Sequence, residues 1–343
     1  MASTTQNAVH INTDSGIIHL KCKKTDTPLI ELWEEQYSVI DEAVVLLSGG
    51  LDSQLTANLA KTFSKSVTAV IFDFVWNNNT INSYDVVTAV RFATQHGIPY
   101  EVKEVDLTDF FDNRLFSFAK KYKIISPQVA AQLYCIDHMT VSDNQTLMLG
   151  GDFPHIGVLH GNIICPLIKQ PGIKSLPKQM VLMSTQLPFD TYSADTGIQI
   201  IKDPFYLTPE IVYQSFVQHA KLIESEKIIY DMTTTAVKSS PWKYKQAFYR
   251  QFEEYGFQFN YPLNKKTGFE TLQVHLACIT GRYNEFDLRY RQPLNSMSDQ
   301  QNWLGPRQPK VVTDPDCLDV IAGIQDMYNT VQPTPCNIYT LDW

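Results

Sequence analysis

A short apolar run that ends in two adjacent glycines constrains the fold of this chain more than any other feature. Residues 43–47 are all Ala, Val or Leu, which predicts a buried strand. After the glycines, Leu55, Leu59 and Phe63 recur every four positions, as on one face of a helix. A glycine turn between a strand and a helix lets backbone N–H groups and the positive helix end face a phosphate group. We therefore predict an anion site here, formed by the following residues: Leu47, Ser48, Gly49, Gly50, Asp52 and Ser53.

The order of patterns after this turn predicts the fold class. Strand-like and helix-like segments alternate, and the expected ranges are strands at 43–47, 67–74 and 100–105 and helices at 52–63 and 83–95. Further helices are expected at about 110–121 and from 126–127 onward. Alternation of this kind predicts an α/β fold with a doubly wound parallel sheet.

A second glycine turn follows a later strand. Residues 146–149 are predicted to form a buried strand, and Gly150, Gly151 and Asp152 come directly after it. Ligands of open parallel sheets bind beyond the carboxyl ends of the strands, so this turn is expected to face the first one. Asp52 and Asp152 are then the candidate ligands for Mg²⁺, which prefers carboxylate oxygens.

The remaining patterns suggest four parts of the chain. We expect an N-terminal approach segment over residues 1–40 and an ATP-binding α/β domain over 41–205, with loops and short elements from 153 to 202. A mostly helical part is expected over 206–290, with helices starting near 209 and spanning about 241–255. Residues 291–343 are rich in Pro, Asn, Gln and Asp and are expected to form an irregular tail.

Composition narrows the class of partners. The net charge of −8 disfavours a broad nucleic-acid surface, and no apolar run reaches the roughly 20 residues of a membrane span. We expect a cytoplasmic protein without a membrane partner. Six cysteines are scattered without a C-x-x-C pair, which gives no support to a zinc site.

Residues 48–53 match the S-G-G-x-D-S signature of the N-type ATP pyrophosphatases, the PP-loop superfamily, which the chain resembles. No lysine of the Walker A type is present in this loop. The resemblance implies an adenine nucleotide alpha hydrolase-like fold, ATP and Mg²⁺ as the bound nucleotide and metal, and cleavage of ATP between the α- and β-phosphates. The enzyme would transfer AMP to a substrate oxygen and release pyrophosphate.

Over about residues 40–275 the chain is most similar to the synthetase domain of the asparagine synthetase family. Phe72 and Asp73 fall where that family holds the adenosine, and Gly150 and Gly151 fall at its second turn. Lys266 lies in a segment that resembles the family's late lysine element, whose lysine contacts the reacting phosphate, and Lys245 could replace it. The resemblance implies an AMP-forming carbon–nitrogen ligase that acts on a small carboxylate or carbonyl substrate.

Two departures from the family pattern affect this interpretation. Phe153 stands where the family has a second acid, so the role of that acid is missing or reassigned. Ala2 stands where glutamine-hydrolysing members have a nucleophilic cysteine, and only about 40 residues precede the motif. We therefore expect ammonia from solution or from a separate glutaminase partner, or an amine on the substrate itself.

Two alternatives stay open. The 7-cyano-7-deazaguanine synthase group also carries S-G-G-x-D-S and resembles residues 43–106 about equally well, although its usual four-cysteine zinc site has no counterpart here. A catalytically reduced protein that binds a nucleotide without turning it over is the second alternative, suggested by Phe153.

Overall fold

The computed structural model describes twelve stretches of the 343-residue chain. Their ranges are 9–12, 17–20, 23–76, 79–80, 82–114, 121–122, 127–150, 180–183, 186–202, 208–226, 246–261 and 309–312. No helix in these stretches has the length and apolar character needed to cross a membrane.

Five parallel strands form the central sheet. In spatial order they are β6 (Tyr100–Asp106), β4 (Ser66–Trp76), β3 (Glu42–Leu46), β7 (Gln145–Leu149) and β9 (Gln199–Lys202). A two-residue strand, β5 (Asn79–Thr80), pairs antiparallel with the end of β4. Buried residues occur on both faces of β3, as expected for a parallel sheet that is covered on both sides. The predicted α/β class and parallel sheet are confirmed.

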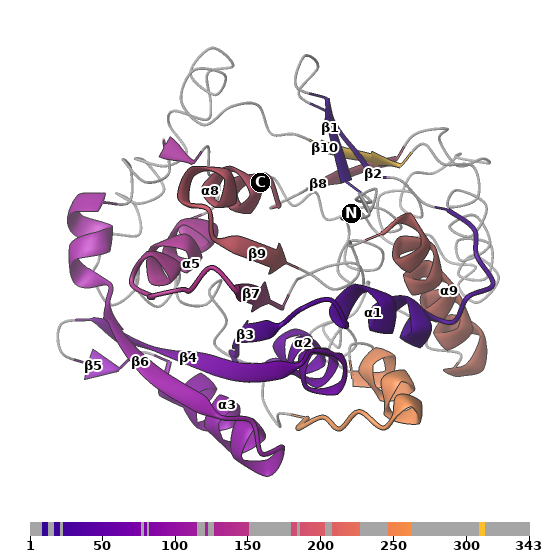
Figure 1. The fold of residues 1–343 in the computed structure, drawn as a ribbon, viewed down its shortest axis with the longest axis horizontal. Helices are drawn as coiled ribbons and strands as arrows, with labels where there is room; N and C mark the ends of the chain where they lie inside the picture. The colour runs from indigo at the N-terminus through magenta and orange to yellow at the C-terminus, as the bar shows by residue number, and fades with distance from the viewer. Residues whose placement is uncertain are drawn as a thin grey trace, which may run out of the picture.

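Helices cover both faces of this sheet (Figure 1). On one face lie α2 (Leu51–Phe63) and α3 (Ser83–Gln95), together with α1 (Leu29–Tyr37) and α9 (Pro209–Glu226). On the other face lie α5 (Pro127–Asp137) and α8 (Gln186–Thr196). Each face has its own hydrophobic core, so the sheet is doubly wound as predicted.

The strand order contains a switch point beside β3. From β3 the chain proceeds outward to β4 and β6, and it then returns to β7 and β9 on the opposite side of β3. The crossovers therefore diverge between β3 and β7, and a crevice at the carboxyl ends of these strands is the usual ligand site of such sheets. Residues 47–50 follow β3 and Gly150 follows β7, so both glycine turns start at this crevice.

Several elements were not predicted. Helix α1 lies inside the supposed approach segment, and Trp33 and Tyr37 on it are fully buried in the core of the α2 face. Helix α8 and strand β9 lie in the region expected to form loops and short elements, whose types and bounds the sequence did not indicate. A π-helical turn at Phe110–Arg114 occupies the first part of the range 110–121 that was expected to form an α-helix.

A second, four-stranded sheet joins segments from distant parts of the chain. Its order is β1 (Val9–Asn12), β2 (Ile17–Leu20), β10 (Pro309–Val312) and β8 (Met180–Met183). Strand β10 lies within the region expected to be an irregular tail, so that expectation is wrong at these four residues. Their sequence is too short to be distinguished from loop by alternation alone.

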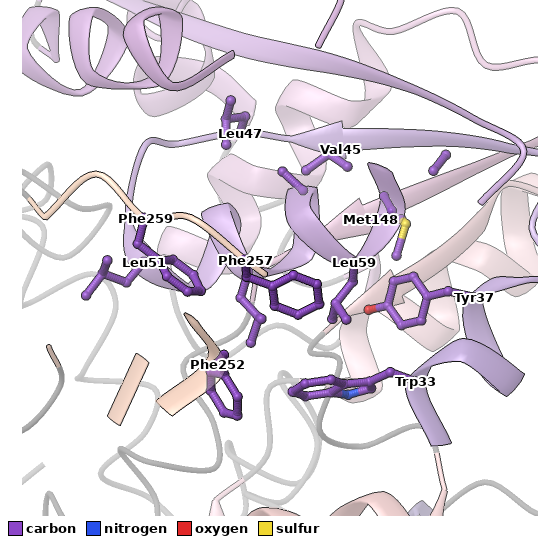
Figure 2. Close-up of a cluster of buried hydrophobic side chains, with 14 of the residues drawn as sticks. Trp33, Tyr37, Val45, Leu47, Leu51, Leu59, Met148, Phe252, Phe257 and Phe259 are labelled. Atoms are coloured by element: carbon purple, nitrogen blue, oxygen red, sulfur yellow. The ribbon is translucent and has the colours of Figure 1, made fainter. Parts of the chain in front are cut away.

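The segment 246–261 packs against α1 and α2 in the larger core (Figures 1 and 2). Its 3₁₀ turn, Gln251–Tyr255, ends at Gly256, which has a φ of 81°. Aromatic rings from it surround Trp33, whose ring centroid lies 5.3 Å from that of Phe252 and 6.5 Å from that of Phe257. We call residues 257–261 the strap, because they run along α2 in a stretch without regular structure.

Candidate functional site

Gly49 forms the turn between β3 and α2. Its φ is +70°, in the left-handed region that favours glycine. A Cβ on it would lie 2.7 Å from the backbone N of Ala89 in α3, closer than any real contact. Gly49 thus needs to be glycine for both conformation and space. Gly50 differs, because its φ of −77° suits any residue and it serves as the N-cap of α2.

Ser48 and Ser53 close the loop with their hydroxyl groups. Ser53 Oγ donates to Gly50 O at 2.9 Å and accepts from Ser48 N at 3.2 Å. Because the single Ser53 proton is used on Gly50 O, the 3.1 Å contact between the two hydroxyls has Ser48 as its donor. The Ser53 hydroxyl is therefore used within the loop, and its contribution to an anion site would come through its backbone N–H.

Gly150 closes the opposite side of the crevice. A Cβ on Gly150 would lie 2.5 Å from Ser53 N and 2.8 Å from the carbonyl carbon of Asp52, both backbone atoms. Gly150, the first residue of the predicted second turn, therefore lies against the first turn of α2. Any side chain at position 150 would fill the space next to the helix N-terminus.

These features fit the phosphates of ATP. The first N–H groups of an α-helix have no partner within the helix, and the helix dipole adds positive potential there. In α2 these groups belong to Leu51, Asp52 and Ser53, and the glycine at position 150 keeps a side chain away from the backbone of Asp52 and Ser53. The first turn of α2 is thus an anion site that backbone atoms alone can provide.

Asp73 lies where β4 extends past the end of β3. Beyond the end of β3, the side chain of Asn82 pairs with the backbone of β4. Its amide donates to Phe72 O and accepts from Phe74 N, both at 2.8 Å. Asp73 points to the α2 face, whereas Phe72 stacks on Phe74 toward the opposite core. Within the described residues, Asp73 Oδ1 is buried without a hydrogen-bond partner. A ligand hydroxyl would satisfy it, so Asp73 fits a nucleotide better than Phe72 does.

Asp52 receives a hydrogen bond from the hydroxyl of Tyr249, which is fully buried. The contact joins the first turn of α2 to the segment 246–261, 197 positions away in the sequence. A carboxylate beside the phosphate site is the hard oxygen ligand that Mg²⁺ uses. Asp52 alone would supply one ligand, and no group of three His, Cys, Asp or Glu residues suited to a metal occurs in the described stretches.

Four of the predicted site residues lie outside the described residues. They are Gly151, Asp152, Lys245 and Lys266. The second metal ligand and both candidate catalytic lysines thus stay predictions. The described site brings residues 47–53 together with Gly150. It adds Tyr249, Asn82 and Gln54, which the sequence analysis did not single out.

One sequence signal points to Gln54. Helix α2 has no charged residue between Asp52 and Lys61, which is typical of a helix buried on all sides. A glutamine within such a helix needs a buried hydrogen-bond partner. No comparable signal marks Tyr249, which lies in a run of aromatic residues that reads as core.

Sequence comparison relates part of this chain to two bacterial enzymes. A stretch of 85 residues is 38% identical to the 7-cyano-7-deazaguanine synthase of Psychrobacter cryohalolentis and 36% identical to that of Psychrobacter arcticus. The match covers 25% of this chain and 29% of each relative, so the chain spans less than a third of the length of these relatives. No protein-family model matches the chain.

Solved structures with similar folds have low overall similarity. An NH3-dependent NAD synthetase from Campylobacter jejuni matches 69% of this chain and 96% of its own, with 14% identity and a TM-score of 0.27. NMN synthetase from Francisella tularensis covers 39% and 56%, with 16% identity and a TM-score of 0.25. The U34-tRNA thiolase NcsA from Methanococcus maripaludis covers 78% and 80%, with 13% identity and a TM-score of 0.29. The comparisons thus show that a quarter of the chain is similar in sequence to two 7-cyano-7-deazaguanine synthases, and the chain carries the S-G-G-L-D-S loop besides.

Proposed function

We propose that this protein is an ATP-dependent synthetase that adenylates an oxygen of a small carboxylate or carbonyl substrate and then forms a carbon–nitrogen bond. The observation that carries the proposal is the contact between Gly150 and the backbone of Ser53 at the switch point of the sheet. It brings the carboxyl end of β7 against the first turn of α2, whose N–H groups can bind a polyphosphate. The S-G-G-L-D-S sequence of the loop supports the pyrophosphate-releasing reaction in particular.

The proposed reaction has two steps. The substrate oxygen attacks the α-phosphorus of ATP, the bond from that phosphorus to the bridging oxygen breaks, and pyrophosphate leaves with the electron pair. Ammonia or an amine then attacks the activated carbon, AMP leaves, and the nitrogen loses a proton. In the first step, the N–H groups of α2 would bind the leaving pyrophosphate as its negative charge increases.

Magnesium would neutralise part of the polyphosphate charge when bound, and Asp52 is the described residue placed to hold it. Tyr249 orients that carboxylate by donating to Oδ1. We assign Lys266 to the cation beside the α-phosphate, with Lys245 as the substitute. The nitrogen donor would be ammonia, delivered free or by a separate glutaminase, or an amine of the substrate.

Product analysis tests this proposal. The purified protein is incubated with ATP, Mg²⁺, ammonia and a panel of carboxylates labelled with oxygen-18, and nucleotides are separated by chromatography. We expect AMP and pyrophosphate, with the label transferred to AMP by the substrate that is adenylated. The variant Gly150→Val is the control, because its side chain would fill the crevice. ADP and phosphate as the main products would contradict the proposal.

A second candidate function has its own support. The identity of 36–38% to two 7-cyano-7-deazaguanine synthases favours a deazaguanine-type substrate. The same assay distinguishes the two, because a deazaguanine carboxylate would then stimulate AMP formation more than amino-acid carboxylates do. If neither class of carboxylate stimulates AMP formation although ATP binds, the result would instead favour the interpretation of a protein that binds a nucleotide without turning it over.

A further inference from the structure

We propose that Gln54 is a positioning residue that aims the backbone N–H of Gly50 at the bound pyrophosphate. The inference rests on the proposed function and deepens it, because it names the side chain that holds the anion loop in its binding conformation. Gln54 follows the S-G-G-L-D-S segment directly, and its side chain is fully buried.

The amide of Gln54 joins the loop to the strap. Its Nε2 donates to Gly49 O at 2.8 Å and to Asn260 O at 2.9 Å, so both amide protons are used. Its Oε1 accepts from the backbone N of Asn260 at 2.7 Å. Gln54 therefore pairs with Asn260 as a neighbouring strand would, and it holds the carbonyl of Gly49 at the same time.

The bond to Gly49 O fixes the direction of the next N–H. In a planar trans peptide the carbonyl of one residue and the N–H of the next point in opposite directions. Because Gly49 O points toward Gln54 and the strap, the N–H of Gly50 points away from them, on the side opposite the buried amide. This N–H precedes the N–H groups of the first turn of α2, which have no acceptor within the helix, and extends the anion site by one donor.

Without Gln54, this peptide would lose its restraint. Gly49 at φ +70° is flanked by Gly50, and two adjacent glycines have the widest choice of backbone conformations. A rotation of the peptide between them would exchange the N–H for a carbonyl oxygen, which repels a phosphate. The side-chain amide is thus the group that selects the binding orientation over the inverted one.

Asn58 provides a matched control. It lies one helical turn after Gln54 and binds the same strap, with Nδ2 donating to Gln258 O at 3.0 Å. Like Gln54 it is buried, but within the described part of the chain its amide donates only to Gln54 O and Gln258 O and not to residues 48–53. A variant of Asn58 therefore loosens the strap and leaves Gly49 O held.

The test compares Gln54→Met with Asn58→Leu, which remove the amides and keep the side-chain size. Binding of inorganic pyrophosphate with Mg²⁺ is measured by calorimetry, and folding is monitored by thermal unfolding. We expect both variants to unfold at lower temperature. Pyrophosphate affinity should fall at least tenfold in Gln54→Met, as for loss of a hydrogen bond to a charged group, and change less than twofold in Asn58→Leu.

Other outcomes separate this inference from the proposed function. Suppose that the wild-type protein binds pyrophosphate. If Gln54→Met then binds it with the same affinity, or if Asn58→Leu loses as much affinity as Gln54→Met does, the role of Gln54 is overturned and the proposed function stays intact. Wild-type protein that binds neither pyrophosphate nor ATP would overturn both. If Gln54→Met does not fold, the amide resonance of Gly50 in the wild type decides by NMR, because pyrophosphate must shift it downfield.

Discussion

Replacement of Gly150 by alanine tests the geometry of the crevice with a single methyl group. The added Cβ would lie 2.5 Å from Ser53 N and 2.7 Å from Ser53 Cα, and ordinary contact begins at 3.4 Å. Strand β7 and the start of α2 must therefore separate by roughly 0.9 Å, because both neighbours are backbone atoms that cannot rotate away.

Overpacking of a core typically lowers the free energy of unfolding by about 1–3 kcal/mol. Because no neighbouring side chain can move aside, we expect Gly150→Ala to lie at the upper end, at about 3 kcal/mol. For a chain of this size we expect the melting temperature to fall by about 5–10 °C. The shift also moves the N–H of Ser53 away from an anion, so affinity for ATP with Mg²⁺ should fall at least tenfold. Calorimetry and thermal unfolding measure the two effects separately.

Gly197→Ala is the control for this variant. Gly197 has a φ of +77°, but a Cβ there would meet no heavy atom within 4 Å. It should cost about 1 kcal/mol through its backbone conformation and leave ATP affinity unchanged. If Gly150→Ala melts at the same temperature as the wild type, the close approach of β7 to α2 is refuted. Lowered stability with unchanged ATP affinity would refute the anion site at the first turn of α2.

Four further variants test other parts of the site and core. Gly50→Val should bind ATP at least tenfold more weakly by calorimetry while it keeps its melting temperature within a few degrees, because a φ of −77° suits valine and the side chain fills the phosphate space. Tyr249→Phe removes the hydroxyl that orients Asp52, and we expect a several-fold higher Mg²⁺ concentration for half-maximal turnover. Lys266→Ala should keep ATP affinity and lower kcat by about 10², since it is proposed to act on transition-state charge; normal turnover would exclude that role. Trp33→Ala should lower the free energy of unfolding by about 3–5 kcal/mol in urea titrations and leave ATP affinity intact in the folded fraction, because Trp33 is fully buried in aromatic contacts away from the loop.

The first half of the sheet could be predicted from sequence because its signals are local. Strand β3 lies in a continuous apolar run that ends at the glycine turn, and α3 occupies the range 83–95 that the pattern indicated. Gly97 adopts the left-handed conformation expected just after that helix, with a φ of 60°. The convergence of the two glycine turns followed from the rule that parallel strands end at one edge.

The later elements lack such signals. Helix α8 contains Pro188 and has no clear apolar face, so its sequence resembles a loop. Strand β9 has four residues and acquires its structure from pairing with β7. Helix α1 does carry a local signal that the prediction did not use, because Leu29, Leu32, Trp33 and Tyr37 recur at helical spacing and are all buried.

The anion loop itself depends on contacts that a local pattern cannot contain. Its turn follows from Gly49 and Gly50, but Asp52 and Gln54 are themselves held by a segment about 200 positions away, through Tyr249 and Asn260 respectively. The strap supplies backbone groups to this pairing, so the identity of residue 260 carries little information about it. What the sequence does carry is a glutamine in a helix without exposed faces. A polar side chain at such a position must have a buried partner, and the loop carbonyl within five residues is one that it can reach. Buried amides near glycine turns are therefore the positions at which sequence analysis can expect a second segment to complete the site, even when that segment cannot be named.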